Sequence, residues 1–125
     1  MARGDRGLIA LAAVLGAAAV ALGAIGSHAL DLDADGSRRF VIANRYHFYH
    51  VLALLMVALT SDVVAVLPRR LAAICWCAGM LLFCGSLYLM AITGYALAPY
   101  LAPSGGLLLI AGWVSFALAA WRGSG

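Results

Sequence analysis

The sequence predicts an all-α integral membrane protein, a bundle of four transmembrane helices joined by short loops. Of the 125 residues, 66% belong to the hydrophobic set and only 10% are charged. An ordinary soluble domain has about 45–50% apolar and about 25% charged residues. The apolar residues also gather in four long runs, each near the length of about 20 residues that a helix needs to cross a bilayer. A chain of this length has room for one domain.

Each apolar run is expected to be a helix, because a span in lipid must pair its backbone N–H and C=O groups internally. The first run lies between Arg6 and Asp31, with no charge between them. The second continues from a helical segment at the membrane interface, for which Ser37 is the expected N-cap. Pro68 and the following Arg residues separate the second and third runs, and Pro99 lies between the last two. The expected spans are residues 7–29, 46–67, 71–93 and 105–121, and the interfacial start of the second helix covers residues 38–45.

A cleaved signal peptide is the competing interpretation of the first run. The chain begins with a basic segment, and Ser27-His28-Ala29 offers the small residues that a signal peptidase reads. However, the apolar stretch is longer than the usual apolar region of a signal peptide, which has about 7–15 residues. A retained helix is therefore the favoured interpretation.

Small residues recur along one face in three of the runs, at spacings of three, four or seven. Such residues let helix backbones approach closely in lipid, and an average spacing of 3.5 residues implies left-handed crossings. The sequence therefore predicts a tight bundle. The packing positions are Ala12, Gly16, Ala19, Gly23 and Gly26 in the first run, Gly79, Ser86 and Thr93 in the third, and Gly105 and Gly112 in the fourth.

Polar side chains at membrane depth are costly and are therefore the candidates for function. Residues three and four apart on a helix share a side, so Tyr46, His47 and His50 are expected to lie together. The short first loop makes the first two spans antiparallel neighbours, which would bring His28 and His50 toward the same membrane face. The complete candidate cluster is His28, Tyr46, His47, His50, Ser86 and Tyr88.

Three interpretations of this cluster stay open. Two histidines on facing helices are able to ligate haem or a transition metal. Two histidines and a tyrosine are able to relay protons or to hold a quinone headgroup. In the third interpretation the same side chains only hydrogen-bond carbonyls, phosphates or each other, and so staple the first helix to the second. No catalytic residue, metal ligand or cofactor is assigned, because the pattern lacks the specificity of a CxxC pair or an HExxH helix.

The three cysteines, Cys75, Cys77 and Cys84, lie in one apolar run. Cysteines on one straight helix cannot reach disulfide geometry with each other, and buried cysteine usually packs as a small hydrophobe. Packing is therefore the expected role of all three.

The arginines sit in small groups that flank the apolar runs, which is typical of headgroup anchors and not of nucleic-acid binding. The lipid bilayer is therefore the expected partner. With four spans, both termini lie on one side of the membrane. That side carries Arg3, Arg6, Arg69, Arg70 and Arg122, and the opposite side carries Arg38, Arg39 and Arg45. By the positive-inside rule both termini are expected in the cytoplasm.

The chain resembles the bacterial domain-of-unknown-function family 423, whose eukaryotic relatives are the small transmembrane protein 256 group. The stretches that carry the resemblance are GAIGSHAL from Gly23, RYHFYHVLAL from Arg45, GMLLFCGSLYL from Gly79 and PSGGLLLIAGW from Pro103. The resemblance implies a four-helix inner-membrane protein with a retained first helix. It implies no established activity, and it places His28, Tyr46, His50, Ser86 and Tyr88 within family-like motifs.

Three functions are carried forward from the sequence. The leading hypothesis is an accessory, interaction or assembly protein of a membrane complex, a homo-oligomer or a larger assembly, that is not an enzyme. It follows from the small-residue faces and from the lack of a recognisable catalytic set. The first alternative is a binder of a membrane-soluble ligand, such as a quinone, a lipid or haem, at the His28/His50 end. The second is a small ion channel, because glycine-rich helices are able to line narrow pores.

Overall fold

The computed structural model describes residues 4–124, so Arg3, one of the charges used for the topology, lies outside it. The helical elements follow in the order α1 Arg6–His28, α2 Ala34–Leu59, α3 Val66–Gly79, η1 Met80–Cys84, α4 Gly85–Thr93 and α5 Leu101–Arg122. η1 and α4 continue α3, so Val66–Thr93 forms one long span, and four helices are long and apolar enough to cross a membrane. The predicted all-α membrane fold is confirmed.

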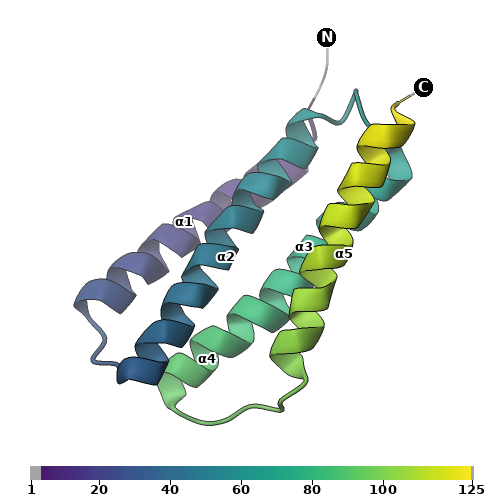
Figure 1. The fold of residues 1–125 in the computed structure, drawn as a ribbon. Helices are drawn as coiled ribbons and strands as arrows, with labels where there is room; N and C mark the ends of the chain where they lie inside the picture. The colour runs from purple at the N-terminus through teal and green to yellow at the C-terminus, as the bar shows by residue number, and fades with distance from the viewer. Residues whose placement is uncertain (1–3, 125) are drawn as a thin grey trace.

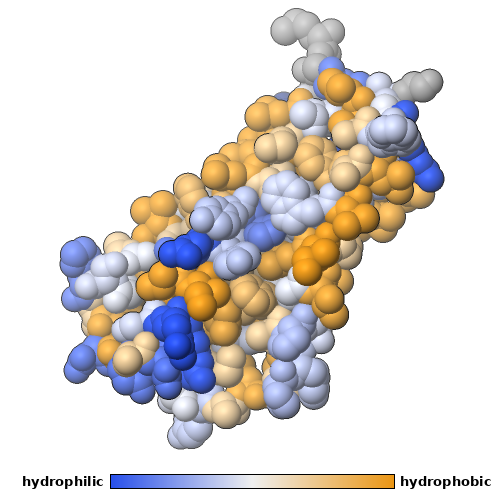
Figure 2. Space-filling model, in the orientation of Figure 1, coloured by the Kyte–Doolittle hydropathy of each residue, from blue (hydrophilic) through white to orange (hydrophobic). Residues whose placement is uncertain are grey.

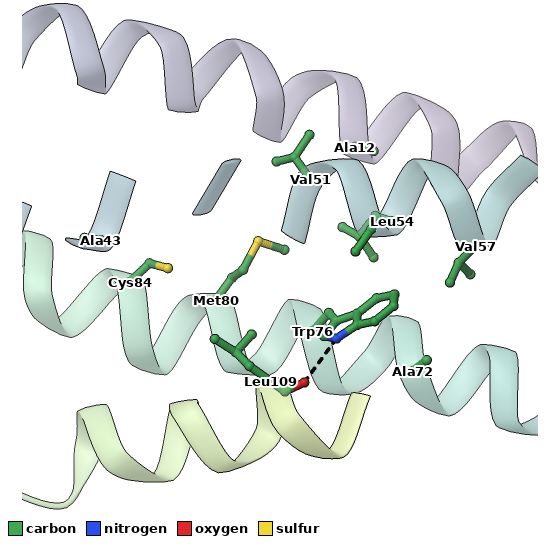
Figure 3. Close-up of a cluster of buried hydrophobic side chains, with 11 residues drawn as sticks. Ala12, Ala43, Val51, Leu54, Val57, Ala72, Trp76, Met80, Cys84 and Leu109 are labelled. Atoms are coloured by element: carbon green, nitrogen blue, oxygen red, sulfur yellow. Dashed lines mark hydrogen bonds between the residues drawn. The ribbon is translucent and has the colours of Figure 1, made fainter. Parts of the chain in front are cut away.

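The four spans run up and down in sequence, and the start of α1 lies at the same end of the bundle as the end of α5 (Figure 1). In the close-up of the core, α2 lies between α1 and the third span, and the third span lies between α2 and α5 (Figure 3). The most extensive contacts join α3 to α5 and α1 to α2, and α2 also packs on η1 and α4. Figure 2 shows apolar side chains over most of the visible length, with the largest hydrophilic patch near the α1–α2 turn.

α2 begins and ends earlier than predicted. Its N-cap is Asp33, whose side chain accepts a hydrogen bond from the Gly36 N–H at 2.6 Å, so the expected cap at Ser37 is wrong. The helix ends at Leu59 and not at Leu67, because the Thr60 hydroxyl donates to the Met56 carbonyl and the chain then turns. Residues 38–45 are helical and continuous with the second span, as predicted.

The third and fourth spans each begin earlier than predicted, with a proline inside their first turn. α3 begins at Val66 with Pro68 as its third residue, and α5 begins at Leu101 with Pro103 as its third residue. Proline is tolerated at these positions because the first turn of a helix has no intrahelical partner for its N–H groups. The prolines therefore mark the starts of helices rather than the loops before them.

A π-helical segment, η1, interrupts the third span, which the sequence analysis did not predict. The Gly85 N–H bonds to the Met80 carbonyl, one residue further back than in an α-helix, and the Ser86 hydroxyl donates to the Leu82 carbonyl within the widened turn. The extra residue changes the face that later side chains present. Ser86 is buried but Thr93 is exposed, so the predicted seven-residue repeat does not form one packing face.

The small residues of α1 face α2. Ala12 and Ala19 are buried. A Cβ at Gly16 would lie 3.3 Å from Val51, and one at Gly26 would overlap the Phe40 ring. α1 is therefore held by close packing of its small residues against side chains of α2, an interaction that drives helix association in lipid.

The small residues of the third span and α5 face each other. A Cβ at Gly79 would lie 2.9 Å from the Gly105 carbonyl oxygen, and one at Gly112 would overlap the Trp76 indole. Trp76 is fully buried and donates from Nε1 to the Leu109 carbonyl at 3.2 Å (Figure 3). It fills the centre of the bundle with Met80 and the α2 residues Leu54 and Val57.

Candidate functional site

The polar candidates do not form one cluster, and His28 stands apart from the rest. His28 is exposed at the last residue of α1. Its antiparallel neighbours belong to the first turns of α2, because Gly26 already lies against Phe40 and Gly16 lies against Val51, next to His50. The expectation that His28 and His50 share one end is therefore wrong, because the first turns of α2, which begins at Ala34, separate His50 from this end.

The first group of polar side chains, which we name the Tyr88 network, consists of Asn44, His47, Tyr88 and the Ala19 carbonyl. Asn44 Nδ2 donates to the Ala19 carbonyl at 2.8 Å and to the Tyr88 hydroxyl at 3.1 Å. The Tyr88 hydroxyl also lies 3.0 Å from His47 Nδ1. The Tyr88 ring contacts Phe40 edge-on at 5.1 Å between centroids. The network therefore joins α1, α2 and α4 at one level of the bundle.

The hydrogen bonds of the Tyr88 network determine which nitrogen of His47 carries the proton. The Asn44 amide is a donor to Tyr88, because its nitrogen also donates to a carbonyl. The single proton of the Tyr88 hydroxyl then goes to His47 Nδ1, which accepts it. A neutral imidazole has one donor and one acceptor nitrogen, so Nε2 of His47 carries the N–H. The ring also makes a hydrogen bond with the backbone of Leu15 on α1, and Nε2–H is the ring atom left to donate it.

The second group, which we name the His50 network, consists of His50, the Tyr46 carbonyl and the indole of Trp113. His50 Nδ1 lies 2.6 Å from the Tyr46 carbonyl oxygen, and Trp113 Nε1 donates to His50 Nε2 at 3.1 Å. A carbonyl only accepts and an indole only donates. His50 is therefore the neutral Nδ1–H tautomer, with both nitrogens paired, and it joins α2 to α5.

Aromatic rings surround His50. Its ring contacts Trp76 and Trp113 edge-on, at 6.2 Å and 5.9 Å between centroids. The ring of Tyr46 stacks on it at 6.3 Å and meets Phe83 at 5.3 Å. Tyr46 and Trp113 are the outermost members, with 40% and 43% of their surfaces exposed. Tyr46 and His50 thus lie toward α5, whereas His47 lies toward α1 and α4, so the three residues do not share one side.

Asn44, Trp76 and Trp113 are the polar partners that the sequence analysis missed. Asn44 is the only asparagine of the chain and was placed at the interface because the second span was expected to start at Tyr46. The N–H of Trp113 donates to His50, a contact that the sequence analysis did not predict. A polar residue inside a correctly placed span is a candidate by itself, so the position of Asn44 is the signal that would have identified the Tyr88 network.

A groove runs along the membrane-facing side of the bundle between α1 and the third span. Two adjoining cavities of about 440 Å³ each share Leu11 and Cys77 in their walls and form this groove. α1 supplies a row of leucines, and the other wall comes from α3, η1 and α4. His47 and Tyr88 line one part of it. We name it the α1 groove, and its lining residues include Leu8, Leu11, Leu15, Leu22, Ile74, Cys77, Met80, Leu81 and Cys84.

A second cavity of about 550 Å³ lies beside the His50 network, between α2, η1 and α5. Its walls are aromatic or aliphatic, with Tyr46, Phe83 and Trp113 among them. Both nitrogens of His50 are already paired within the protein. Within the part of the chain that the structure describes, no three His, Cys, Asp or Glu side chains come together as metal ligands.

The two histidines are expected to be opposite neutral tautomers although they are only three residues apart. Nitrogen-15 spectra of the imidazoles in micelles should show His47 with the proton on Nε2 and His50 with the proton on Nδ1, because Tyr88 and the Tyr46 carbonyl impose these states. In Tyr88→Phe, the His47 signals should change and those of His50 should not. A single common tautomer in both rings would contradict the two networks.

Comparison with known proteins places this fold in a family. The model of the family "Protein of unknown function (DUF423)" matches residues 22–106, more than half of the chain. The chain belongs to this family. The resemblance noted from the sequence motifs is thereby confirmed, and the match includes both polar networks except Ala19 and Trp113.

Relatives of this DUF423 chain match nearly its whole length. A UPF0382 membrane protein of Haemophilus influenzae is 34% identical over 116 residues, which cover 91% of this chain and 93% of the relative. The UPF0382 membrane protein YwdK of Bacillus subtilis is also 34% identical over 116 residues, covering 90% and 94%. No solved structure matches the chain. This DUF423 chain is therefore a membrane protein, as its four long apolar helices also indicate.

Proposed function

We propose that this protein is an accessory subunit or assembly factor of a complex in the bacterial cytoplasmic membrane, without catalysis of its own. The observation that carries the proposal is the position of α1. This helix packs extensively on α2 alone, and its outer face is exposed along its length. The exposed small residues on that face are Ala10, Ala13, Ala17, Ala21 and Ala24.

The outer face of α1 has the properties of a helix-docking surface. Its alanines follow spacings of three and four, so they lie along one side of the helix. Small residues at such spacings let another helix approach closely, and close packing drives helix association in lipid. A transmembrane helix of a partner, or α1 of a second copy, therefore fits this face.

The polar networks support a structural role of the buried side chains. The hydrogen bonds of Asn44, Tyr88 and His50 are made to other helices or to backbone carbonyls. These bonds hold the bundle together, and they favour the stapling interpretation of the polar residues over acid–base chemistry.

We further propose that both termini face the cytoplasm. The start of α1 and the end of α5 lie at one end (Figure 1), where Arg6, Arg70 and Arg122 are available to anchor the protein at headgroups. Arg69 at the same end is buried and pairs with Asp5, with 3.8 Å between Nη1 and Oδ2.

Native mass spectrometry tests the accessory role. The protein is extracted from its own membranes in mild detergent at endogenous expression. The expected spectrum contains a stoichiometric protein partner or a second copy. Ala17→Leu should reduce the complex several-fold, because the larger side chain prevents close approach at the outer face of α1. Ala117→Leu, a matched change at an exposed position of α5, should leave the complex intact. A lone monomer in the native spectrum would contradict the proposal.

A further inference from the structure

A polar pocket lies between α1 and α2, near the end of the bundle where these two helices are joined. It holds about 400 Å³, and its walls include Gly23 and Ser27 of α1 and Ser37, Val41 and Arg45 of α2. We name it the Arg45 pocket. Its volume lies within the range of about 300–1,000 Å³ that small-molecule sites have. The α1 groove and the second cavity are lined by no arginine or aspartate of the described chain, so the Arg45 pocket is the cavity that suits a charged group.

The guanidinium of Arg45 has no partner within the part of the chain that the structure describes. Arg38 pairs with Asp35 at 3.0 Å, whereas Arg45 makes no hydrogen bond or ion pair with a described residue. No aspartate lines the pocket, and the Asp33 side chain caps α2 by accepting from the Gly36 N–H. A guanidinium stays charged and carries five N–H donors. The partner of Arg45 is therefore an anion from outside the chain.

The level of Arg45 in the membrane suits a lipid phosphate. Its neighbour Asn44 lies against α1 at Gly23, where a Cβ would be 3.0 Å from Asn44 Oδ1. Gly23 lies five residues before His28, the last residue of α1, which is about 7.5 Å at a rise of about 1.5 Å per residue. Helical side chains lean toward the N-terminus of their helix, which for α2 is the headgroup end. The guanidinium of Arg45 thus reaches the headgroup layer from a backbone position just inside the hydrocarbon.

An apolar strip on α2 continues from the pocket toward the middle of the membrane. Arg45, Phe48 and Leu52 follow spacings of three and four, so they share one side of the helix. Phe48 is 40% exposed and Leu52 is 48% exposed, which leaves both side chains available to acyl chains. The polar pocket at the outer end and the apolar strip at the inner end match the two parts of a phospholipid. A free phosphate ion would use only the pocket.

We propose that the Arg45 pocket binds the phosphodiester group of a membrane phospholipid, with the acyl chains lying along Phe48 and Leu52. Guanidinium N–H groups donate in parallel to two phosphate oxygens, a geometry that favours arginine at phosphate sites. Ser37 supplies a hydroxyl in the same pocket. The proposal does not depend on the accessory role, because other residues form the outer face of α1.

Native mass spectrometry of the delipidated protein, titrated with dioleoyl phosphatidylglycerol, tests the site. Arg45→Gln should weaken binding of the first lipid about tenfold, as expected when a charged hydrogen-bonding partner is lost. Arg39→Gln is the matched control, because it removes the same charge from an exposed position of α2 outside the pocket. It should leave the affinity unchanged. Unchanged binding in Arg45→Gln, or equal weakening by both substitutions, would overturn the proposal, since equal weakening indicates unspecific attraction by positive charge.

Two further ligands separate the phospholipid from its parts. Dioleoylglycerol has the same chains without the phosphate, and it should bind about tenfold more weakly than dioleoyl phosphatidylglycerol, with no difference between the native chain and Arg45→Gln. Inorganic phosphate in large excess should not displace the bound phospholipid, because it makes no contact with the apolar strip. Equal binding of dioleoylglycerol would contradict a phosphate contact at Arg45. Displacement by inorganic phosphate would identify a site for a free anion and would overturn the proposal as well.

Discussion

Gly105→Ala is expected to destabilise the bundle by about 3 kcal/mol, at the upper end of the cost of overpacking a close contact. A Cβ at this position would lie 2.8 Å from the Phe83 Cβ and 2.9 Å from the Leu82 carbonyl carbon. Backbone atoms cannot move aside as a flexible side chain can, so α5 must separate from η1. The decrease in the free energy of unfolding is measured by unfolding the protein in mixed micelles. The mole fraction of dodecyl sulfate is increased and tryptophan fluorescence is the readout.

The adjacent glycine provides the control for this substitution. A Cβ at Gly106 would meet the Phe83 ring at 3.7 Å, an ordinary contact distance. Alanine also favours a helix over glycine by about 0.5–1 kcal/mol. Gly106→Ala should therefore unfold at the same detergent fraction as the native chain or at a slightly higher one. Equal destabilisation by the two substitutions would show that helix propensity, and not the approach of α5 to η1, limits stability here.

Trp76→Ala is expected to lower the free energy of unfolding by about 3 kcal/mol, the lower end of the range for truncating a buried Phe or Trp to Ala. The indole is fully buried and lies against Trp113 and Phe116, at 4.8 Å and 5.8 Å between centroids. Lipid tails are as apolar as the core, so the loss comes from packing and from the bond to the Leu109 carbonyl rather than from transfer out of water. Thermal unfolding followed by circular dichroism gives the change.

Trp121→Ala is the matched control, because 89% of this residue is exposed at the end of α5. This substitution should change the midpoint temperature of thermal unfolding very little. Trp76→Phe should fall between the native chain and Trp76→Ala, because it keeps a ring but removes the N–H. If Trp76→Ala unfolds like Trp121→Ala, the aromatic centre of the bundle is not what holds α3 to α5.

Fold class and helix packing follow from sequence because each depends on local chemistry. Long apolar runs require helices in lipid, and the small residues of α1 mark the side that meets α2. The start of α2 was predicted four residues too late for an equally local reason. Ser37 and Asp33 are both residues that favour an N-cap, and it is Asp33 that caps the helix.

The partners within the polar networks could not be predicted from the sequence, because they depend on contacts between helices far apart in the sequence. Tyr88 meets Asn44 across 44 residues, and Trp113 meets His50 across 63. The level at which these residues meet depends on the true start of α2 and on the extra residue of η1. Neither the start of α2 nor the extra residue of η1 can be recognised from apolar residues alone. The sequence of Met80–Cys84, for example, is as compatible with an α-helix as that of any other span.

The distribution of hydrogen bonds divides the protein into two helical hairpins. Residues 4–59 form the first, and residues 66–124 form the second. Asn44 binds Ala19 within the first hairpin, and Trp76 binds Leu109 within the second. By contrast, the bonds from Tyr88 to Asn44 and His47, and from Trp113 to His50, all cross between the hairpins.

This division has a consequence for how the protein is made. Each hairpin is able to enter the bilayer as a unit with its glycine and alanine contacts already formed, and the two then meet sideways in the membrane. A slide of one hairpin by a single helical turn would keep much of the apolar contact but separate Tyr88 and Trp113 from their partners. The crossing bonds therefore select one register between two halves that lipid alone would leave free to slip.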